Sequence, residues 1–237
     1  MKSVLSLSIL LLGLSYAPAS LAANQYAFVR TSQSNTGGFF SAPNVSMSSG
    51  WSSSNSCAFL VKTSWLGFKG TYSRADDWIE LGRVNGAVQN PQGNATCSGG
   101  KVSNYDAYYT ARGRYNSAGV LDYAEFPITN ISTSGTHNYQ IKKVSSADWR
   151  TYIDGITTLT YPGWSAANAT THDVGWEANN NTSSWASPNY STAHQILVNG
   201  SWTNWGSLGK VDASTGGNTL GWFANPDGGT SQAKFTR

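Results

Sequence analysis

A segment that decides the fold of this chain reads HNYQIKKV (137–144), SSAD (145–148) and WRTYIDG (149–155). Tyr139 and Ile141 fall on one face of an extended strand, because side chains alternate between the two faces of a strand. Trp149 and Ile153 share a face of the second strand in the same way. The polar residues between the two runs form a turn, so the segment predicts a β-hairpin.

The same texture continues along the whole chain. Short runs rich in β-branched and aromatic residues alternate with turn clusters about every 8–12 residues, which is typical of a sandwich or barrel. The expected strands, beside the hairpin above, are 26–31, 57–65, 77–84, 107–115, 120–126, 194–198, 201–205, 220–223 and 232–236. We predict an all-β fold of roughly ten to fourteen strands, arranged as two antiparallel sheets in a jelly roll. A closed up-and-down barrel is the alternative.

Residues 1–22 have the features of a secretory signal peptide. Lys2 provides a positive charge, an apolar stretch follows, and Ser20-Leu21-Ala22 is a small-residue cleavage site. The apolar stretch is too short for a membrane anchor. No linker divides the rest, so we predict one β-sandwich domain over 23–237 and a secreted protein, extracellular or periplasmic, with no membrane partner.

Charge and cysteine content limit the classes of function. The chain has 15 Lys+Arg and 12 Asp+Glu residues, and the basic ones are scattered. Nucleic-acid binding would need a basic stripe, so we expect no nucleic-acid partner. Cys57 and Cys97 are predicted to form a structural disulfide in an oxidising compartment. No sequence neighbour could activate either thiol as a nucleophile.

Glutamate is rare in this chain, and its positions are informative. The three glutamates are Glu80, Glu125 and Glu177. Two of them lie inside short hydrophobic runs that contain tryptophan, DWIELG (77–82) and VGWEA (174–178). A carboxyl group that loses water in such a strand has a raised pKa, and two facing carboxyls can form an acid–base pair. Glu125 lies near a strand end, where we expect a solvated position or the edge of a substrate site.

Alternation assigns Glu80 to the face of its sheet that points away from the core. Ile79 and Leu81 suit the space between two sheets, so Glu80 and Trp78 point the other way.

The second run gives the same result for Glu177. Val174 and Trp176 share the core face, and Glu177 lies on the opposite one. We therefore predict a concave sheet surface that carries both glutamates. Gly82 and Gly175 are expected to leave room there for a substrate backbone.

Two of these motifs resemble the catalytic strands of the glutamic peptidases. The fungal members have a Leu-Gln-Thr-Gly type strand and a later Ala-Glu-Trp type strand, whereas neprosin-like members have two glutamates, in Ile-Glu-Ala-Gly and Gly-Gly-Glu type contexts. Ile79-Glu80-Leu81-Gly82 is similar to the first site and Gly175-Trp176-Glu177 to the second. Tyr105-Asp106-Ala107-Tyr108-Tyr109 is similar to the aromatic strand that follows the first site. The resemblance covers short pieces within 60–180.

This resemblance implies a concanavalin-like jelly roll and a secreted, monomeric acid endopeptidase that needs neither metal nor cofactor. Glu80 and Glu177 would be the catalytic pair and a polypeptide the substrate. Ionised Glu177 would activate water, and protonated Glu80 would polarise the scissile carbonyl. Trp78, Tyr108 and Trp176 are the implied substrate contacts.

Two other readings stay open, a carbohydrate-directed protein and a non-catalytic member of the same fold. The chain has ten tryptophans and twelve tyrosines, which could stack on the sugar rings of a polysaccharide. Four tryptophans in loop or hairpin settings could form such a platform: Trp164, Trp185, Trp202 and Trp205. A retaining glycosidase would also use two carboxyls, about 5 Å apart. The Glu-x-Asp-x-x-Glu strand of laminarinase-like sandwiches does not occur. The histidines are isolated, so we predict no zinc site.

Overall fold

The protein is described here by a computed structural model, which covers residues 24–69, 77–97, 100–180, 182–206, 209–211, 223–226 and 232–236. All regular secondary structure in these residues is β, as the sequence predicts. The predicted signal peptide, and all but the last residue of the strand expected at 220–223, lie outside the described residues. Within the described part, no helix is long and apolar enough to cross a membrane.

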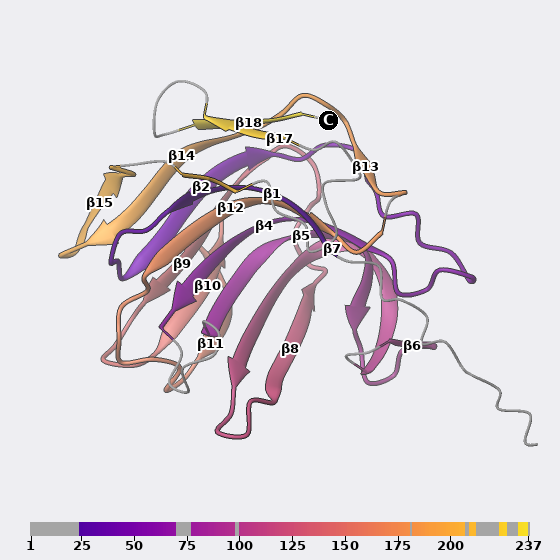
Figure 1. The fold of residues 1–237 in the computed structure, drawn as a ribbon, viewed down its shortest axis with the longest axis horizontal. Coiled ribbons are helices and arrows are strands. Elements are labelled where there is room, and N and C mark those ends of the chain that lie inside the picture. Colours follow the sequence, from indigo (N-terminus) through magenta and orange to yellow (C-terminus); the bar gives the residue numbers. More distant parts are fainter. Residues whose placement is uncertain are drawn as a thin grey trace, which may run out of the picture.

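Two antiparallel sheets of eight strands each form a sandwich (Figure 1). The first sheet has the order β16 (Gly209–Val211), β1 (Gln25–Thr31), β12 (Thr171–Ala178), β4 (Phe59–Phe68), β5 (Asp77–Gln89), β7 (Gly100–Tyr115) and β6 (Ala95–Cys97), with β8 (Leu121–Ile128) also paired to β7. The second sheet has the order β11 (Ile156–Tyr161), β10 (Trp149–Ile153), β9 (Thr136–Lys143), β2 (Gly37–Pro43), β14 (Asn189–Val198), β18 (Gln232–Thr236) and β17 (Phe223–Pro226), with β15 (Ser201–Asn204) also paired to β14. A small third sheet pairs β3 (Met47–Ser48) with β13 (Ser184–Trp185). In the described part of the chain the sheets are open at their edges, so the barrel alternative is wrong.

The predicted hairpin is present, and two further pairs of expected strands also form hairpins. β9 and β10 pair with Tyr139 opposite Ile153, β7 pairs with β8, and β14 pairs with β15. The described residues contain eighteen strands, more than expected, because several pairings involve only two or three residues. The strand expected at 77–84 continues to Gln89. It passes through Gly86, whose φ of +117° is a conformation that side-chain-bearing residues rarely adopt.

The main core lies between the two large sheets. Its largest fully buried side chains include Trp149, Trp176, Trp205, Phe40 and Phe68. A second apolar cluster lies on the other side of the first sheet and contains Val61, Val84, Val88, Tyr109 and Ala111. The first sheet is therefore covered by apolar side chains on both faces. Its outer face is not an ordinary solvated surface.

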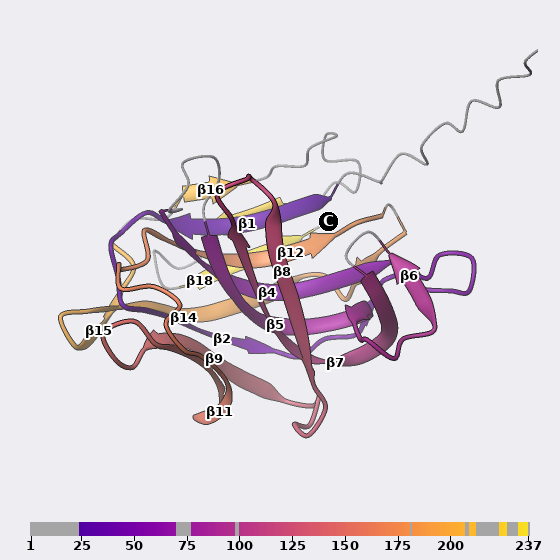
Figure 2. The ribbon, with the colours of Figure 1, turned by 90° about the horizontal axis from the view of Figure 1, so that it is seen from below.

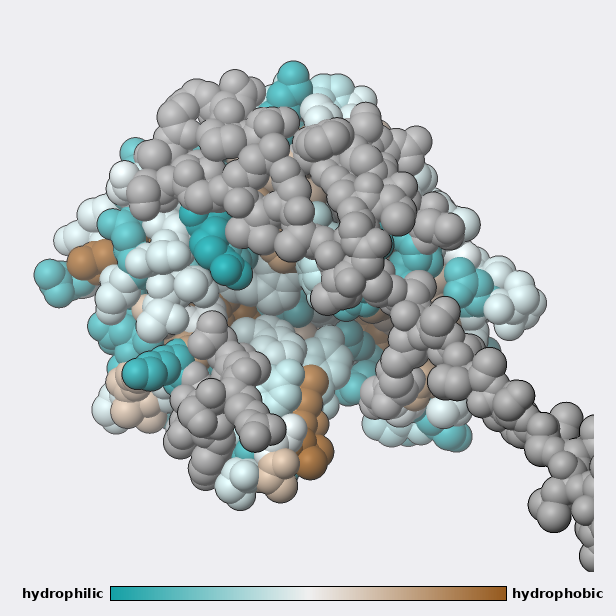
Figure 3. All heavy atoms as spheres, viewed as in Figure 1, coloured by the Kyte–Doolittle hydropathy of each residue, from teal (hydrophilic) through white to brown (hydrophobic). Residues whose placement is uncertain are grey.

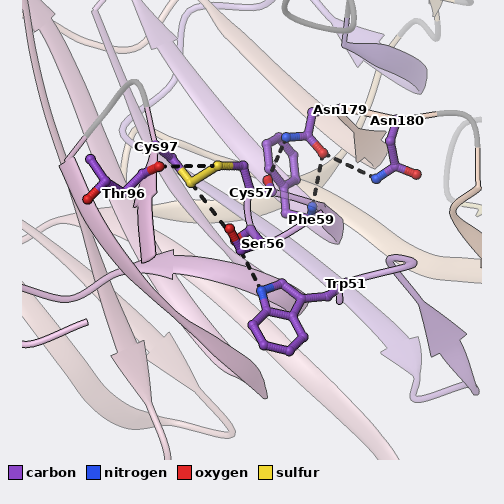
Figure 4. Close-up of a disulfide and its surroundings, with 8 residues drawn as sticks. All are labelled: Trp51, Ser56, Cys57, Phe59, Thr96, Cys97, Asn179 and Asn180. Atoms are coloured by element: carbon purple, nitrogen blue, oxygen red, sulfur yellow. Dashed lines mark hydrogen bonds between the residues drawn. A yellow bond between two sulfur atoms is a disulfide. The ribbon is translucent and has the colours of Figure 1, made fainter. Parts of the chain in front are cut away.

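The predicted disulfide joins Cys57, just before β4, to Cys97 at the end of β6 (Figure 4). Asn179, which follows β12, donates a hydrogen bond from Nδ2 to the Cys57 carbonyl at 2.7 Å and accepts one from the Phe59 amide at 3.0 Å. These contacts tie one end of the first sheet together across several strands.

Exposed apolar side chains gather on the β7–β8 hairpin. Val120 is 60% exposed, and Leu121 and Phe126 are 38% exposed each. Figure 3 shows this as a brown strip along β8, within a surface that is otherwise mostly teal or pale. The hairpin forms one wall of the site described next.

Candidate active site

A cleft of about 860 Å³ lies on the face of the first sheet that points away from the sandwich core. Its floor and walls come from β1, β12, β4, β5, β7 and β8, which Figure 2 shows together from below. Eight of its lining residues are aromatic: Tyr26, Phe28, Phe59, Trp65, Trp78, Tyr109, Tyr115 and Tyr123. All three glutamates of the chain, Glu80, Glu125 and Glu177, also line this cleft.

Glu80 lies on β5 in the middle of the cleft, and its neighbours in sequence, Ile79 and Leu81, are fully buried in the sandwich core. Only 5% of Glu80 is exposed. Its Oε1 accepts a hydrogen bond from the Tyr109 hydroxyl on β7. Burial, followed by the charge of Glu177, raises the pKa of Glu80 well above its usual value, and the hydrogen bond from Tyr109 only partly opposes this. Glu80 is therefore the carboxyl that keeps its proton most readily.

Glu177 lies on β12, and a hydrogen bond from the residue before β1 holds its side chain in place. Asn24 donates a hydrogen bond from Nδ2 to its Oε1 at 2.6 Å. Burial raises the pKa of Glu177 to about 7, while hydrogen bonds from Tyr26 and Asn24 lower it and the charge of Glu125 raises it further. Val174 and Trp176 lie in the core, so the face predicted for Glu177 from the alternation of its strand is confirmed.

The two carboxyls come from strands that are separated by β4. Glu177 faces Val61 on β4, and Val61 faces Val84 on β5, four positions after Glu80. In a flat sheet this offset would place their Cα atoms roughly 16 Å apart. Each carboxyl extends from its strand into the same cleft, and the charge of Glu177 reaches Glu80. The two carboxyls have different hydrogen-bond partners, Tyr109 for Glu80 and Asn24 for Glu177.

Glu125 lines the cleft from β8, a strand at the side of the sheet, so of the two positions expected from the sequence the edge of the site fits and a solvated position does not. It is half-buried on β8, in register with Ala111, which in turn pairs with Glu80. The Tyr123 hydroxyl donates to its Oε1 at 2.5 Å, and the Gln89 amide donates to its Oε2 at 2.7 Å. Burial raises the pKa of Glu125, and its charge raises the pKa values of both other glutamates. Tyr123 and Glu125 share one face of their strand, and this alternation could have predicted that both side chains point into the cleft.

The structure divides the three predicted substrate contacts. Trp78 lines the cleft, as expected. Tyr108 and Trp176 do not, because both are fully buried between the sheets. The Tyr108 hydroxyl bonds to Asn44 and to the Ser132 carbonyl, and Trp176 stacks on Trp185 with ring centroids 4.5 Å apart. Those two predictions are wrong, since both residues follow the core-facing alternation of their strands.

Tyr109, one position after Tyr108, is the aromatic residue of β7 that reaches the cleft. It is buried and bonds to Glu80. Trp65, opposite Glu80 on β4, is the other functional candidate that the sequence did not single out. Its ring lies 4.2 Å from that of Phe28, centroid to centroid, and forms a continuous aromatic wall with it.

The two glycines near the glutamates have a different role from the predicted one. A Cβ atom at Gly82 would lie 2.3 Å from the Lys62 carbonyl oxygen, and one at Gly175 would lie 2.5 Å from the Phe28 ring. Neither glycine lines the cleft. They make room for neighbouring strands and rings of the protein itself, not for a substrate backbone.

The cross-strand row that contains Glu125 and Glu80 ends in an ion pair. Asp173 on β12, opposite Trp65, receives bonds from Arg30 Nε at 2.5 Å and Nη2 at 2.7 Å. No group of three or more His, Cys, Asp or Glu side chains that could hold a metal ion occurs among the described residues. The chemistry that the cleft offers is that of carboxyl groups with raised pKa values beside aromatic walls.

This combination of fold and site is that of a concanavalin-like sandwich with a carboxyl-lined concave sheet. No protein-family model and no curated protein sequence matches the chain. Among solved structures, scytalido-glutamic peptidase with a transition state analog inhibitor matches with a TM-score of 0.54 at 12% identity, covering 91% of this chain and 98% of that one. The same peptidase with a peptide-based transition state analog matches with a TM-score of 0.50 over the same shares, also at 12% identity.

A glycoside hydrolase family 16 endo-glucanase from Bacteroides ovatus matches more distantly, with a TM-score of 0.39 at 10% identity over 66% of each chain. The likeness to the peptidase is one of fold. The chain thus has a concanavalin-like β-sandwich fold, which scytalido-glutamic peptidase shares.

Proposed function

We propose that this protein is a secreted, monomeric endopeptidase of the glutamic type, with Glu80 and Glu177 as its catalytic pair. The observation that carries the proposal is the presence of both glutamates in one cleft, each with a raised pKa and each fixed by its own hydrogen-bond donor. Buried carboxyls whose pKa values are raised to different extents suit the paired roles of acid and base.

The division of roles follows from the two environments. Glu177 has the lower proton affinity of the pair and acts as the base that takes a proton from the attacking water. Glu80 keeps its proton and donates a hydrogen bond to the scissile carbonyl, which stabilises the oxyanion as it develops. The proton on Glu177 then passes to the leaving amine. The space between the two carboxyls accommodates the water and the peptide bond.

The electrostatics of the cleft change the expected pH optimum. Activity requires ionised Glu177 and protonated Glu80. The pKa of Glu177, about 7, places the lower limb of the pH–rate profile near neutrality. The higher pKa of Glu80 sets the upper limb. The site therefore favours a higher optimum than the acidic one that the family resemblance implies.

The direct test is hydrolysis of casein and of quenched fluorescent peptides between pH 3 and pH 9. The substitution Glu177→Gln should lower kcat/KM by roughly 10³-fold, because glutamine keeps the shape of the side chain but cannot act as the base. Asp122→Asn on β8 is a matched control, because Asp122 is an exposed carboxyl outside the cleft. Wild-type activity in the Glu177→Gln enzyme would refute the proposal.

A carbohydrate-directed function is the second candidate. Trp65 and Trp78 are both half-buried in the cleft beside Glu80, an arrangement that could stack on sugar rings. A pull-down with insoluble polysaccharides separates the two candidates. Retention on a polysaccharide together with no peptide hydrolysis at any pH would favour the glycan-directed reading.

A further inference from the structure

A polar seam crosses the sandwich core, on the opposite face of the first sheet from the cleft. It lies between the two large sheets, and each of its side chains is at most 4% exposed. The members are Lys62 and Ser64 on β4, His172 on β12, and Asn189, Ser191 and His194 on β14. The proposed peptidase mechanism uses none of these residues.

Lys62 is an unusual member of this seam, because a buried lysine normally pairs with a carboxylate. Its Nζ instead donates to Asn189 Oδ1 and to the Tyr190 carbonyl at 2.8 Å, and it lies 5.7 Å from the ring centroid of Trp176. Among the described residues, no carboxylate forms an ion pair with it. Burial lowers the pKa of Lys62 well below its usual value, so the side chain readily loses its proton and becomes a neutral, nucleophilic amine.

Asn189 presents an amide to this amine. The contact between Nζ and Oδ1 places the amine one C=O bond away from the amide carbon Cγ. On the other side of Cγ, Nδ2 is buried and has no hydrogen-bond partner among the described residues. The amide nitrogen is therefore not held in place by the protein. The amide carbon Cγ therefore has a nucleophile next to it and carries a leaving group that no hydrogen bond holds.

We propose that Lys62 and Asn189 form an intramolecular amide cross-link between the two sheets. The lone pair of Nζ attacks Cγ, and one proton of the amine passes to Nδ2. The Cγ–Nδ2 bond then breaks, and its electron pair leaves with ammonia. The second proton of the amine stays on the new amide nitrogen. The reaction consumes no oxidant, reductant or cofactor.

The surroundings favour this reaction. Ser191 and His194 stand on the same strand as Asn189, with Ser191 Oγ and His194 Nε2 2.7 Å apart. Burial lowers the pKa of His194 to about 3, with a further contribution from the charge of Lys62, so the imidazole is uncharged and adds no repulsion for the amine. The strands on both sides fix the reacting groups, which removes most of the entropy cost of bringing them together.

The structural consequence is a covalent tie between the centres of the two sheets. β4 is a central strand of the first sheet, and β14 is a central strand of the second. The described disulfide, by contrast, links positions that both border the first sheet. The cross-link would close a loop of the chain that runs through most of the domain.

The test is the intact mass of the wild-type protein, made in a host that does not glycosylate it and measured after reduction of the disulfide. We expect a mass lower than that of the unmodified chain by one ammonia, about 17 Da. Trypsin does not cleave after an acylated lysine. The digest should therefore contain a branched species that joins fragments 31–69 and 151–210.

Two variants sharpen the experiment. Asn189→Ala removes the electrophile and should have its full mass, with normal cleavage after Lys62. Lys143→Met changes a surface lysine that donates to the Ala166 carbonyl, and it should still show the loss of ammonia. A wild-type protein at full mass without the branched species would overturn the proposal, and so would ammonia loss in Asn189→Ala. The wild-type measurement decides the matter even if Asn189→Ala does not fold.

Discussion

The two buried histidines of the core seam should make the stability of this protein fall steeply with acid. His172 and His194 are both fully buried, and burial, the largest cause for each, lowers both pKa values from 6.5 to about 3. The unfolded chain binds protons at these sites below pH 6.5, whereas the folded chain does not until about pH 3. The free energy of unfolding therefore decreases as the pH falls through this window.

The size of the effect follows from the shift. Each pH unit between the two pKa values costs about 1.4 kcal/mol per histidine, so one histidine accounts for about 2.5 kcal/mol between pH 7 and pH 4.5. Glu177 acts in the opposite direction, because its pKa is raised to about 7 and the folded state gains protons first. The histidine contribution is thus best isolated by comparing variants and not from the wild type alone.

The perturbation is His172→Gln, which keeps a polar group near Ser64, the partner of His172 Nε2 at 2.8 Å. Unfolding in urea, followed by tryptophan fluorescence at pH 7 and pH 4.5, gives the loss of stability between the two conditions. We expect this loss to be smaller in the variant by about 2.5 kcal/mol. Val174→Ala on the same strand is the control, since it removes core packing without removing a titrating group.

Lower stability of His172→Gln at both pH values would not affect the argument, because only the difference between them is used. Equal pH dependence in the wild type and in His172→Gln would show that the buried imidazole is protonated in the folded state, and the reasoning would be refuted.

Three further outcomes are expected. Glu125→Gln removes a charge that raises the pKa of Glu177, so the lower limb of the pH profile of kcat/KM should move to lower pH; an unmoved limb would contradict this coupling. Tyr109→Phe removes a hydrogen bond that lowers the pKa of Glu80, so the upper limb should move to higher pH, as measured with the same peptide substrate. Replacing both cysteines by serine opens a link with a sequence separation of 40 and should reduce the free energy of unfolding in urea by about 4 kcal/mol, and a loss below 1 kcal/mol would speak against the chain-entropy estimate.

Local pattern was sufficient for the hairpin at 137–155 and for the faces of the strands that carry Glu80 and Glu177. Alternation over two or three residues on each side of Glu80 and Glu177 identifies the core face, because a strand has a period of two and buries one side in the sandwich. The same rule, applied strictly, would have excluded Tyr108 and Trp176 as substrate contacts and chosen Tyr109. Those two errors came from following motif similarity in place of the alternation.

The register of paired strands was beyond the reach of the sequence. Glu125 joins the cleft because β8 pairs with β7 in a register that places it across Ala111 from Glu80. Its local sequence gives no sign of that neighbour. The short strands were missed for a related reason, since two- or three-residue pairings are stabilised by their partners and not by their own propensity.

The sequence by itself determined that the chain is all-β and which face of its strand each of Glu80 and Glu177 occupies, because both follow from periodicity within a few residues. Only the tertiary structure decided that three glutamates share one cleft and that Lys62 meets Asn189 inside the core. Those contacts depend on sheet order and on the stacking of one sheet on the other. Their consequences, raised and lowered pKa values, arise from burial, which no single strand can produce alone.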